Sequence, residues 1–277
     1  MPPFTVQKLM PTRFLPGCSA YVRLFSTLLL VPVLNGCRGS LVASGLVQPS
    51  PESLDRNRDF QWVRDTTPHF LVRVEAGSGT AARVDSIGLG LEAALRRVLE
   101  SLELGEETEP IHAYAVASPQ RVRALLGREV GGRAFFGTRV FAFAAAGDWN
   151  ATARHELTHV VLRGRWPGEP EQWLNEGVAT YVGDHFYGRN VHRLVRERLV
   201  AGGRVLRLRD LARDFSRYPD EVSYLQAASV AKYLRERFGM AALRAVWAGG
   251  IAALPGATGQ DLDAFERGWR EAVDRAE

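Results

Sequence analysis

The segment His155-Glu156-Leu157-Thr158-His159 carries the clearest chemical pattern in the chain. On a helix, residues four positions apart share a face, so the two histidines can each present an imidazole nitrogen to one metal ion. Glu156 would then lie beside the metal, where a base can take a proton from a water molecule. The alternative is a surface helix with a histidine pair, and the aliphatic run Val160–Leu162 argues against it.

A catalytic zinc ion needs three protein ligands and one open position. The metzincin pattern would place a glycine and a third histidine where this chain has Leu162 and Arg165, so that class is excluded. The better third ligand is Glu176, because the glycine- and proline-containing loop 164–168 lets a second helix return against the first. We therefore expect Glu176 to face the histidine pair.

These segments together resemble the two-part signature of the gluzincin metallopeptidases. The pattern is His-Glu-x-x-His at 155–159, followed by Trp-Leu-Asn-Glu-Gly-x-Ala-x-Tyr at 173–181. The most similar members are the small peptidase-MA-like domains related to aminopeptidases of the thermolysin clan. Weaker similarity continues through 224–239 and the C-terminal helix, so the resemblance covers about residues 60–277.

The resemblance implies that His155, His159 and Glu176 bind one Zn²⁺ per chain, and that Glu156 activates the water that attacks a peptide carbonyl. It also implies a further donor to the developing oxyanion from a later helix. Tyr224 is the candidate, with a packed aromatic ring as the alternative. The implied function is a zinc metallopeptidase acting on peptide or protein substrates. The alternative function is a catalytically silent metal-binding scaffold or interaction protein of the same fold.

The chain departs from relatives beside the third ligand. Many relatives carry an acidic residue four positions after the glutamate ligand, where it orients a zinc-bound histidine. Here that position is Thr180, and either Asp184 or a backbone carbonyl could serve instead. Asn175 could hold the second helix in place or be a surface amide. We expect His185 and His192 to be structural or solvent-facing.

The strand Arg139–Phe143 resembles the edge strand that pairs with extended substrate in this family, with a plain core strand as the alternative. The Gly-x-Met-Glu-Asn motif, by which the aminopeptidases bind a free amine, is absent from the sequence. That absence favours endopeptidase action or an unusual substrate.

The elements that must position these residues follow from hydrophobic periodicity. Strands are predicted over His69–Glu75, Ile111–Ala117 and Thr138–Ala144. Helices are predicted over Ala81–Leu104, Ser118–Leu126, Asn150–Arg163, Glu169–Val182, Val191–Ala201, Leu208–Asp214, Val222–Phe238, Met240–Ala248 and Leu262–Ala276. Strands before helices predict an α+β fold: a small, mostly antiparallel sheet, then a helical zincin-type half, with the active-site helix between them.

The N-terminal segment 1–36 is typical of an export signal. It contains basic residues and no acidic residue, followed by the apolar run Leu24–Leu34, which is about half as long as a membrane-spanning helix. The sequence Leu-Asn-Gly-Cys at 34–37 resembles the lipobox of bacterial lipoproteins, although Asn35 is unusual there. The alternatives are an ordinary signal peptide or a buried apolar helix, and translation could also begin at Met10.

A lipidated Cys37 would anchor the protein to a membrane of the bacterial cell envelope. Arg38 is not the aspartate that retains lipoproteins in the inner membrane, so the expected place is the periplasmic face of the outer membrane, if the cell has one. Without a lipid, the protein would be secreted. Residues 37–59 read as a tether rich in glycine, serine and proline, and 60–277 as the metallopeptidase domain.

The charge of the chain is explained by this signal. The 277 residues carry 35 Lys+Arg against 31 Asp+Glu, a net charge of +4. Lys8, Arg13 and Arg23 account for +3 within residues 1–36, which leaves +1 for the rest. The arginine cluster in 193–209 is interrupted by acidic residues and lacks aromatic residues, so we expect a solvated helical face and no nucleic-acid partner.

Overall fold

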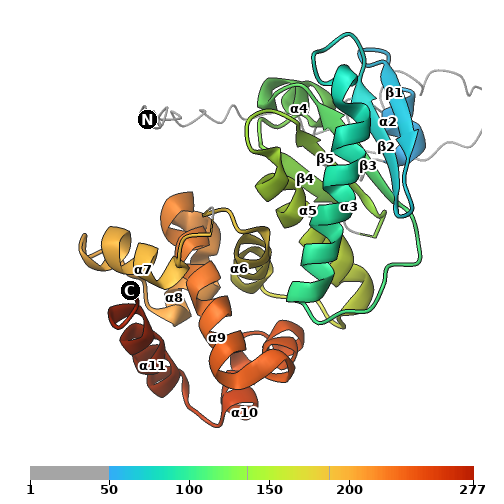
Figure 1. Cartoon of the computed structure of the whole chain (residues 1–277). Helices are drawn as coiled ribbons and strands as arrows, with labels where there is room; N and C mark the ends of the chain where they lie inside the picture. The colour runs from blue at the N-terminus through green and yellow to red at the C-terminus, as the bar shows by residue number, and fades with distance from the viewer. Residues whose placement is uncertain (1–49, 136, 187) are drawn as a thin grey trace, which may run out of the picture. The chain divides into compact units, whose positions relative to one another are not determined.

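The computed structural model describes residues 50–135, 137–186 and 188–277. The predicted signal peptide, Cys37 and most of the predicted tether lie outside the described residues. Within the described part, the strands are β1 (Trp62–Thr66), β2 (Phe70–Glu75), β3 (Ile111–Val116), β4 (Gly132–Phe135) and β5 (Val140–Ala144). The helices are α2 (Pro51–Asp55), α3 (Val84–Ser101), α4 (Pro119–Leu126), α5 (Trp149–Arg165), α6 (Gln172–Gly183), α7 (Val191–Val195), α8 (Leu208–Asp214), α9 (Asp220–Gly249), α10 (Leu254–Thr258) and α11 (Leu262–Asp274) (Figure 1).

The strands form one mixed sheet in the order β1-β2-β3-β5-β4. β2, β3 and β5 run parallel, while β1 and β4 pair antiparallel with β2 and β5 at the two edges. The α+β class predicted from the sequence is confirmed. The sheet is mixed rather than mostly antiparallel. α3 connects β2 to the parallel strand β3, and α4 together with the antiparallel strand β4 connects β3 to the parallel strand β5.

Alternating side chains of the sheet enter two different cores. Phe141 and Phe143 of β5 face the main core, which they share with α3 and α5. Val140 and Ala142 face the opposite way, into a smaller core closed by α2 and α4. The side-chain period of two along a strand therefore lets β5 be buried on both faces. Every residue of β5 is buried.

The helical half surrounds α9. This long helix packs against α6, where Gly177 of α6 comes so close that an added Cβ would lie 2.7 Å from the Ala227 carbonyl oxygen. Gly239 interrupts α9 with a left-handed φ of 83°. The sequence predicts two helices on either side of this glycine, and the break in backbone dihedrals lies where the two predicted helices meet. Figure 1 shows α9 between α6 and the C-terminal helices α10 and α11.

Several boundaries differ from the sequence prediction. Residues 51–55, assigned to the tether, form α2, because Leu54 is buried and Asp55 pairs with Arg73 of β2 at 2.9 Å. Strands β1 and β4 were not predicted, since short edge strands with polar residues lack a clear alternating pattern. Among the described residues, none of the helices has the length and apolar character needed to cross a membrane.

The interpretation of Arg139–Phe143 as a substrate-pairing edge strand is wrong. β5, which spans most of that segment, is hydrogen-bonded to β3 on one side and to β4 on the other. Its backbone has no free edge, so the alternative of a core strand holds. The outer strand on this side of the sheet is β4.

Candidate metal centre

The predicted metal ligands come from two adjacent helices. His155 and His159 lie one turn apart on α5, and Glu176 lies on α6, which packs against α5. Gly183 allows this approach at the end of α6, since an added Cβ would lie 3.1 Å from the backbone nitrogen of His155. Among the described residues, these three side chains have the residue types and mutual distances that could hold a metal ion.

Three donor atoms of this group converge. His155 Nε2 lies 3.1 Å from His159 Nε2 and 3.2 Å from Glu176 Oε2. The third side of the triangle, from His159 Nε2 to Glu176 Oε2, measures 3.5 Å. Ligand atoms at the usual bond lengths from a tetrahedral zinc lie about 3.3 Å from one another. The donor types and their spacing therefore fit one Zn²⁺ ion bound by two imidazoles and a carboxylate.

The electrostatics of the three donors point the same way. Burial alone would raise the pKa of Glu176, but hydrogen bonds and charge from His155 and His159 outweigh it and hold that pKa well below its usual range. Burial alone would lower the pKa of His159, and Glu176 instead raises it. The carboxylate is therefore ionised and attracts positive charge at the point where the imidazole nitrogens meet.

Glu156 lies beside this triangle and is held by β4. Burial raises the pKa of its carboxyl group, opposed by the charges of His155 and His159, while the backbone N–H of Ala134 donates a hydrogen bond to it. Gly132 of β4 is close enough that an added Cβ would lie 2.8 Å from Glu156 Cγ. A glycine in a strand can signal such a close approach, but the pair at 131–132 was interpreted as a turn.

Two further side chains reach the group. Tyr224 of α9 places its ring 6.5 Å from the ring of His155. Burial is the main cause that raises the pKa of the Tyr224 hydroxyl, and the negative charge of Glu176 raises it further. The hydroxyl also donates a hydrogen bond to Glu176. His185 lies just after α6, with its ring 4.8 Å from that of His155. Burial, then the charges of His155 and Arg154, lower its pKa to about 4. The spacing of His185 in the sequence does not indicate this contact with His155.

The outer contacts of the two histidines differ. His159 Nδ1 lies 3.2 Å from Asn175 Oδ1, so Asn175 acts on a ligand rather than lying on the surface. His155 Nδ1 is buried without a hydrogen-bond partner in the described residues, as is the hydroxyl of Thr180. Asp184 does not fill this role: its carboxylate accepts from the Gly188 N–H and lies 4.0 Å from Arg154.

Three arginines of the cluster in 193–209 pair with acidic residues, among them Arg193 and Arg204. Arg193 lies 3.3 Å from Glu197, and Arg204 lies 3.2 Å from Glu221. His192 of α7 is buried against Ser229. These contacts are structural, and none of them involves His155, His159 or Glu176.

Comparisons with known proteins give a distant likeness only. No protein-family model matches the chain, and no curated protein matches it either. Among solved structures, the chain is similar to an M1 zinc metallopeptidase from Deinococcus radiodurans, with 17% identity, 78% of this chain and 52% of that chain covered, and a TM-score of 0.48. It is also similar to Legionella pneumophila aminopeptidase A, with 16% identity and a TM-score of 0.47. That match covers 76% of this chain and 28% of the aminopeptidase. The chain thus spans about half or less of the length of these proteins.

Proposed function

We propose that this protein is a zinc-dependent metallopeptidase. The observation that supports it best is the triangle of His155, His159 and Glu176 donors with sides of 3.1–3.5 Å, next to the buried carboxylate of Glu156. Two imidazoles, one carboxylate ligand and one further carboxylate are the set that metal-assisted hydrolysis needs.

A zinc ion at this site would supply Lewis acidity toward a substrate carbonyl and toward water. The chain's own residues supply the rest. Glu156, held by the Ala134 N–H and with a raised pKa, is suited to take a proton from water near neutral pH and to pass it to the leaving amine. Tyr224, whose pKa is raised, would keep its hydroxyl proton and, when substrate binds, would donate it to the carbonyl oxygen instead of to Glu176.

The outer edge of β4 supports an extended peptide as substrate. In the described sheet, β4 pairs only with β5, so its other edge offers backbone groups for pairing. Gly132 and Ala134 lie on this strand directly beside Glu156. A peptide that pairs with β4 would bring a peptide bond to the base and the metal ligands.

The function is tested with the purified full chain, loaded with zinc, and a peptide library of mixed sequence. We expect cleavage by the wild-type chain and a loss of at least about a hundredfold in Glu156→Gln, with zinc content unchanged. A chain that binds zinc but cleaves no peptide would contradict the proposal and favour the silent-scaffold alternative. Equal cleavage by Glu156→Gln would refute the role of that residue.

We further propose that the protein is exported and anchored to the bacterial cell envelope through a lipid on Cys37. The support is the sequence alone: the basic and apolar segment 1–36 and the lipobox-like 34–37. In cells that carry the lipoprotein pathway, Cys37→Ser should move the protein from the membrane fraction to the soluble fraction. Matched expression of Cys18→Ser should leave it with the membranes, and unchanged fractionation of Cys37→Ser would exclude the anchor.

A further inference from the structure

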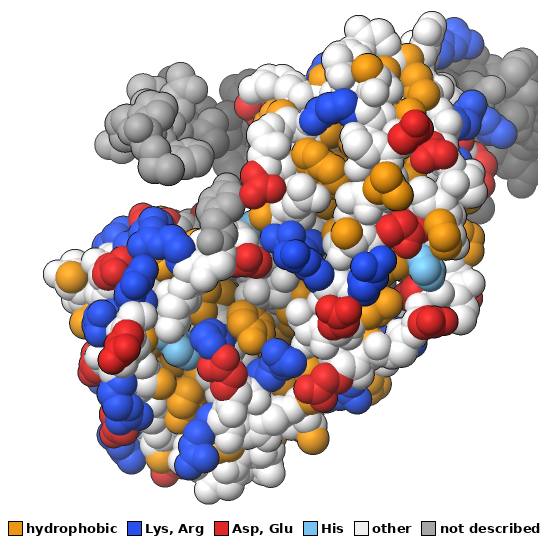
Figure 2. All heavy atoms as spheres, viewed as in Figure 1, with side chains coloured by type: hydrophobic (Ala, Val, Ile, Leu, Met, Phe, Trp, Pro, Cys, Tyr) orange, Lys and Arg blue, Asp and Glu red, His pale blue; other side chains and the backbone are white. Residues whose placement is uncertain are grey.

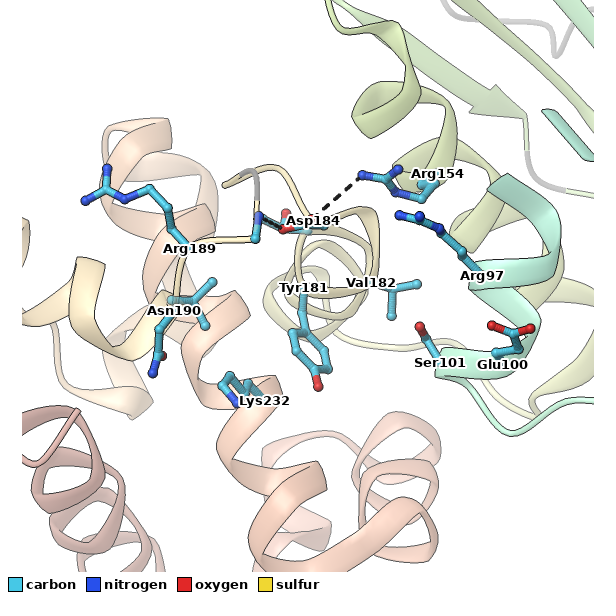
Figure 3. Close-up of a pocket in the computed structure, with 13 residues that line it drawn as sticks. Arg97, Glu100, Ser101, Arg154, Tyr181, Val182, Asp184, Arg189, Asn190 and Lys232 are labelled. Atoms are coloured by element: carbon cyan, nitrogen blue, oxygen red, sulfur yellow. Dashed lines mark hydrogen bonds and ion pairs between the residues drawn. The ribbon is translucent and has the colours of Figure 1, made fainter. Parts of the chain in front are cut away.

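A cavity separate from the metal donors opens among five helices. It has a volume of about 480 Å³ and is lined by residues of α3, α5, α6, α7 and α9. None of His155, His159 or Glu176 lines it. Figure 3 shows the side chains that surround it, and Figure 2 shows Lys and Arg side chains gathered on the face between α6 and α3.

Two arginines from different helices lie together at one side of this cavity. Arg97 of α3 and Arg154 of α5 both line it, and Figure 3 shows them next to each other opposite Asp184. Arg154 is only 12% exposed. Burial is the main cause that lowers the pKa of Arg154. The charge of Asp184 raises this pKa, and the positive charge of Arg97 lowers it, because the two guanidinium groups are close enough to repel each other.

The acidic groups nearby do not balance these charges. Asp184 lies 4.0 Å from Arg154, beyond hydrogen-bond distance, and its carboxylate already accepts a hydrogen bond from the Gly188 N–H at 2.7 Å. The Nε–H of Arg154 donates a hydrogen bond to the Gly183 carbonyl oxygen at 3.0 Å. Within the described chain, no ion pair or hydrogen bond of Arg97 is found, so its donors remain for a ligand.

The rest of the lining adds one buried donor. Arg189 and Lys232 also line the cavity, but Arg189 pairs with Glu197 at 3.1 Å and Lys232 pairs with Glu236. The hydroxyl of Thr180, which is 2% exposed, lies on this lining and has no hydrogen-bond partner in the described residues. An unused buried hydroxyl thus lies on the same lining as Arg97 and Arg154, while the other two cations of the lining already have acidic partners.

We propose that this cavity is a binding site for a small oxyanion, a carboxylate or phosphate group. The guanidinium group matches the geometry of both groups by presenting parallel N–H donors. An oxyanion between Arg97 and Arg154 would relieve the repulsion of the two charges, and the Thr180 hydroxyl supplies a further donor. This site does not depend on peptidase activity, since the metal donors lie outside it.

The test is calorimetric titration of the metal-free full chain, desalted after chelation so that no chelator carboxylate remains. Inorganic phosphate and succinate are the two probes, each at an ionic strength held constant with sodium chloride. Binding of phosphate alone would identify a phosphate site, and binding of succinate alone a carboxylate site. Binding of neither anion overturns the proposal.

A pair of neighbouring arginines provides the matched control. Arg97→Gln should weaken the binding of the active probe about tenfold or more, because it removes a charged hydrogen-bond donor. Arg96→Gln removes the same charge from the same helix, and Arg96 is exposed as Arg97 is, but Arg96 does not line the cavity. Wild-type affinity in Arg96→Gln together with loss in Arg97→Gln supports the site. Equal affinity in both variants refutes it, and zinc content or peptide cleavage has no bearing on either result.

Discussion

His159 Nδ1 donates its proton to Asn175 Oδ1 across 3.2 Å, which leaves Nε2 of the same ring to face His155 and Glu176. The amide oxygen of Asn175 can only accept, so it selects the tautomer with the proton on Nδ1. Asn175, directly before Glu176 on α6, therefore orients a candidate metal ligand on α5. This contact links the two helices at the centre of the candidate metal site.

Removal of this contact should weaken zinc binding. We expect Asn175→Ala to lower zinc affinity about 10–100-fold, because partners of a ligating histidine fix its orientation and basicity. Asn175→Asp keeps an acceptor at the same place and should retain most of the affinity. Competition with a fluorescent chelator measures both. Equal losses in the two variants would mean that packing, and not the hydrogen bond, accounts for the effect.

Zinc should stabilise the folded chain through Glu176. At a free zinc concentration of about 1,000 times the Kd, binding to the native state adds about 4 kcal/mol to the free energy of unfolding, or roughly 10 °C in Tm. Glu176→Ala removes one ligand and should abolish most of this zinc-dependent increase. Glu169→Ala is the control, because Glu169 is 81% exposed and its ion pair among the described residues is with Arg163. A full zinc-dependent increase in Glu176→Ala would show that the ion is bound elsewhere.

Gly132 should tolerate no side chain. An added Cβ would lie 2.8 Å from both Glu156 Cγ and Thr152 Cγ2, so β4 or the base must move. We expect Gly132→Ala to cost about 1–3 kcal/mol in unfolding free energy and to lower peptide cleavage. Gly131→Ala is the matched control, since its Cβ would meet Thr152 at an ordinary 3.6 Å. Similar behaviour of the two variants in urea unfolding and cleavage would contradict the close contact.

The sequence predicted those parts of the site that depend on local spacing. His155 and His159 lie one helical turn apart, and Glu176 lies on a helix that a short loop folds back. Both relations follow from helix geometry and chain connectivity, and the structure brings these residues together. The break in α9 at Gly239 was predicted for the same reason, because glycine disfavours a helix interior.

The parts that the sequence did not predict depend on contacts between distant segments. β4 is four residues long and begins at Gly132 directly after Gly131, a pattern that indicates a turn until its pairing with β5 is known. His185 reaches His155 only through the fold of the turn after α6. The order of the strands, which places β5 inside and β4 outside, is likewise set by tertiary pairing and has no signature in the residues of Arg139–Phe143.

His192 should make the stability of the fold depend on pH. Its side chain is buried, and Nδ1 lies 2.7 Å from Ser229 Oγ, which also accepts a hydrogen bond from Trp269 Nε1 at 2.9 Å. The Ser229 hydroxyl can donate its proton to Nδ1 of a neutral imidazole while it accepts from Trp269. Burial lowers the pKa of His192 to about 4, the charge of Lys232 acts in the same direction, and Glu236 opposes it.

The direction of the effect follows from proton binding in the two states. In the unfolded chain His192 binds its proton near pH 6.5, whereas in the folded chain it binds near pH 4. Between these values the unfolded state holds more protons, so the free energy of unfolding falls as the pH falls through this window. The contribution is fully present above pH 6.5 and lost below pH 4, and it amounts to about 3 kcal/mol.

His192→Asn keeps a polar group next to Ser229 but removes the titration. Urea unfolding of the metal-free chain at pH 7.5 and pH 4 should therefore show a smaller loss of stability for the variant than for the wild type, by about 3 kcal/mol. The comparison between the two proteins cancels the contributions of the other titrating groups, which are present in both. Parallel losses in wild type and variant would show that His192 is protonated at the same pH in the folded and unfolded chain, and that the buried Ser229–Trp269 contact tolerates the charge.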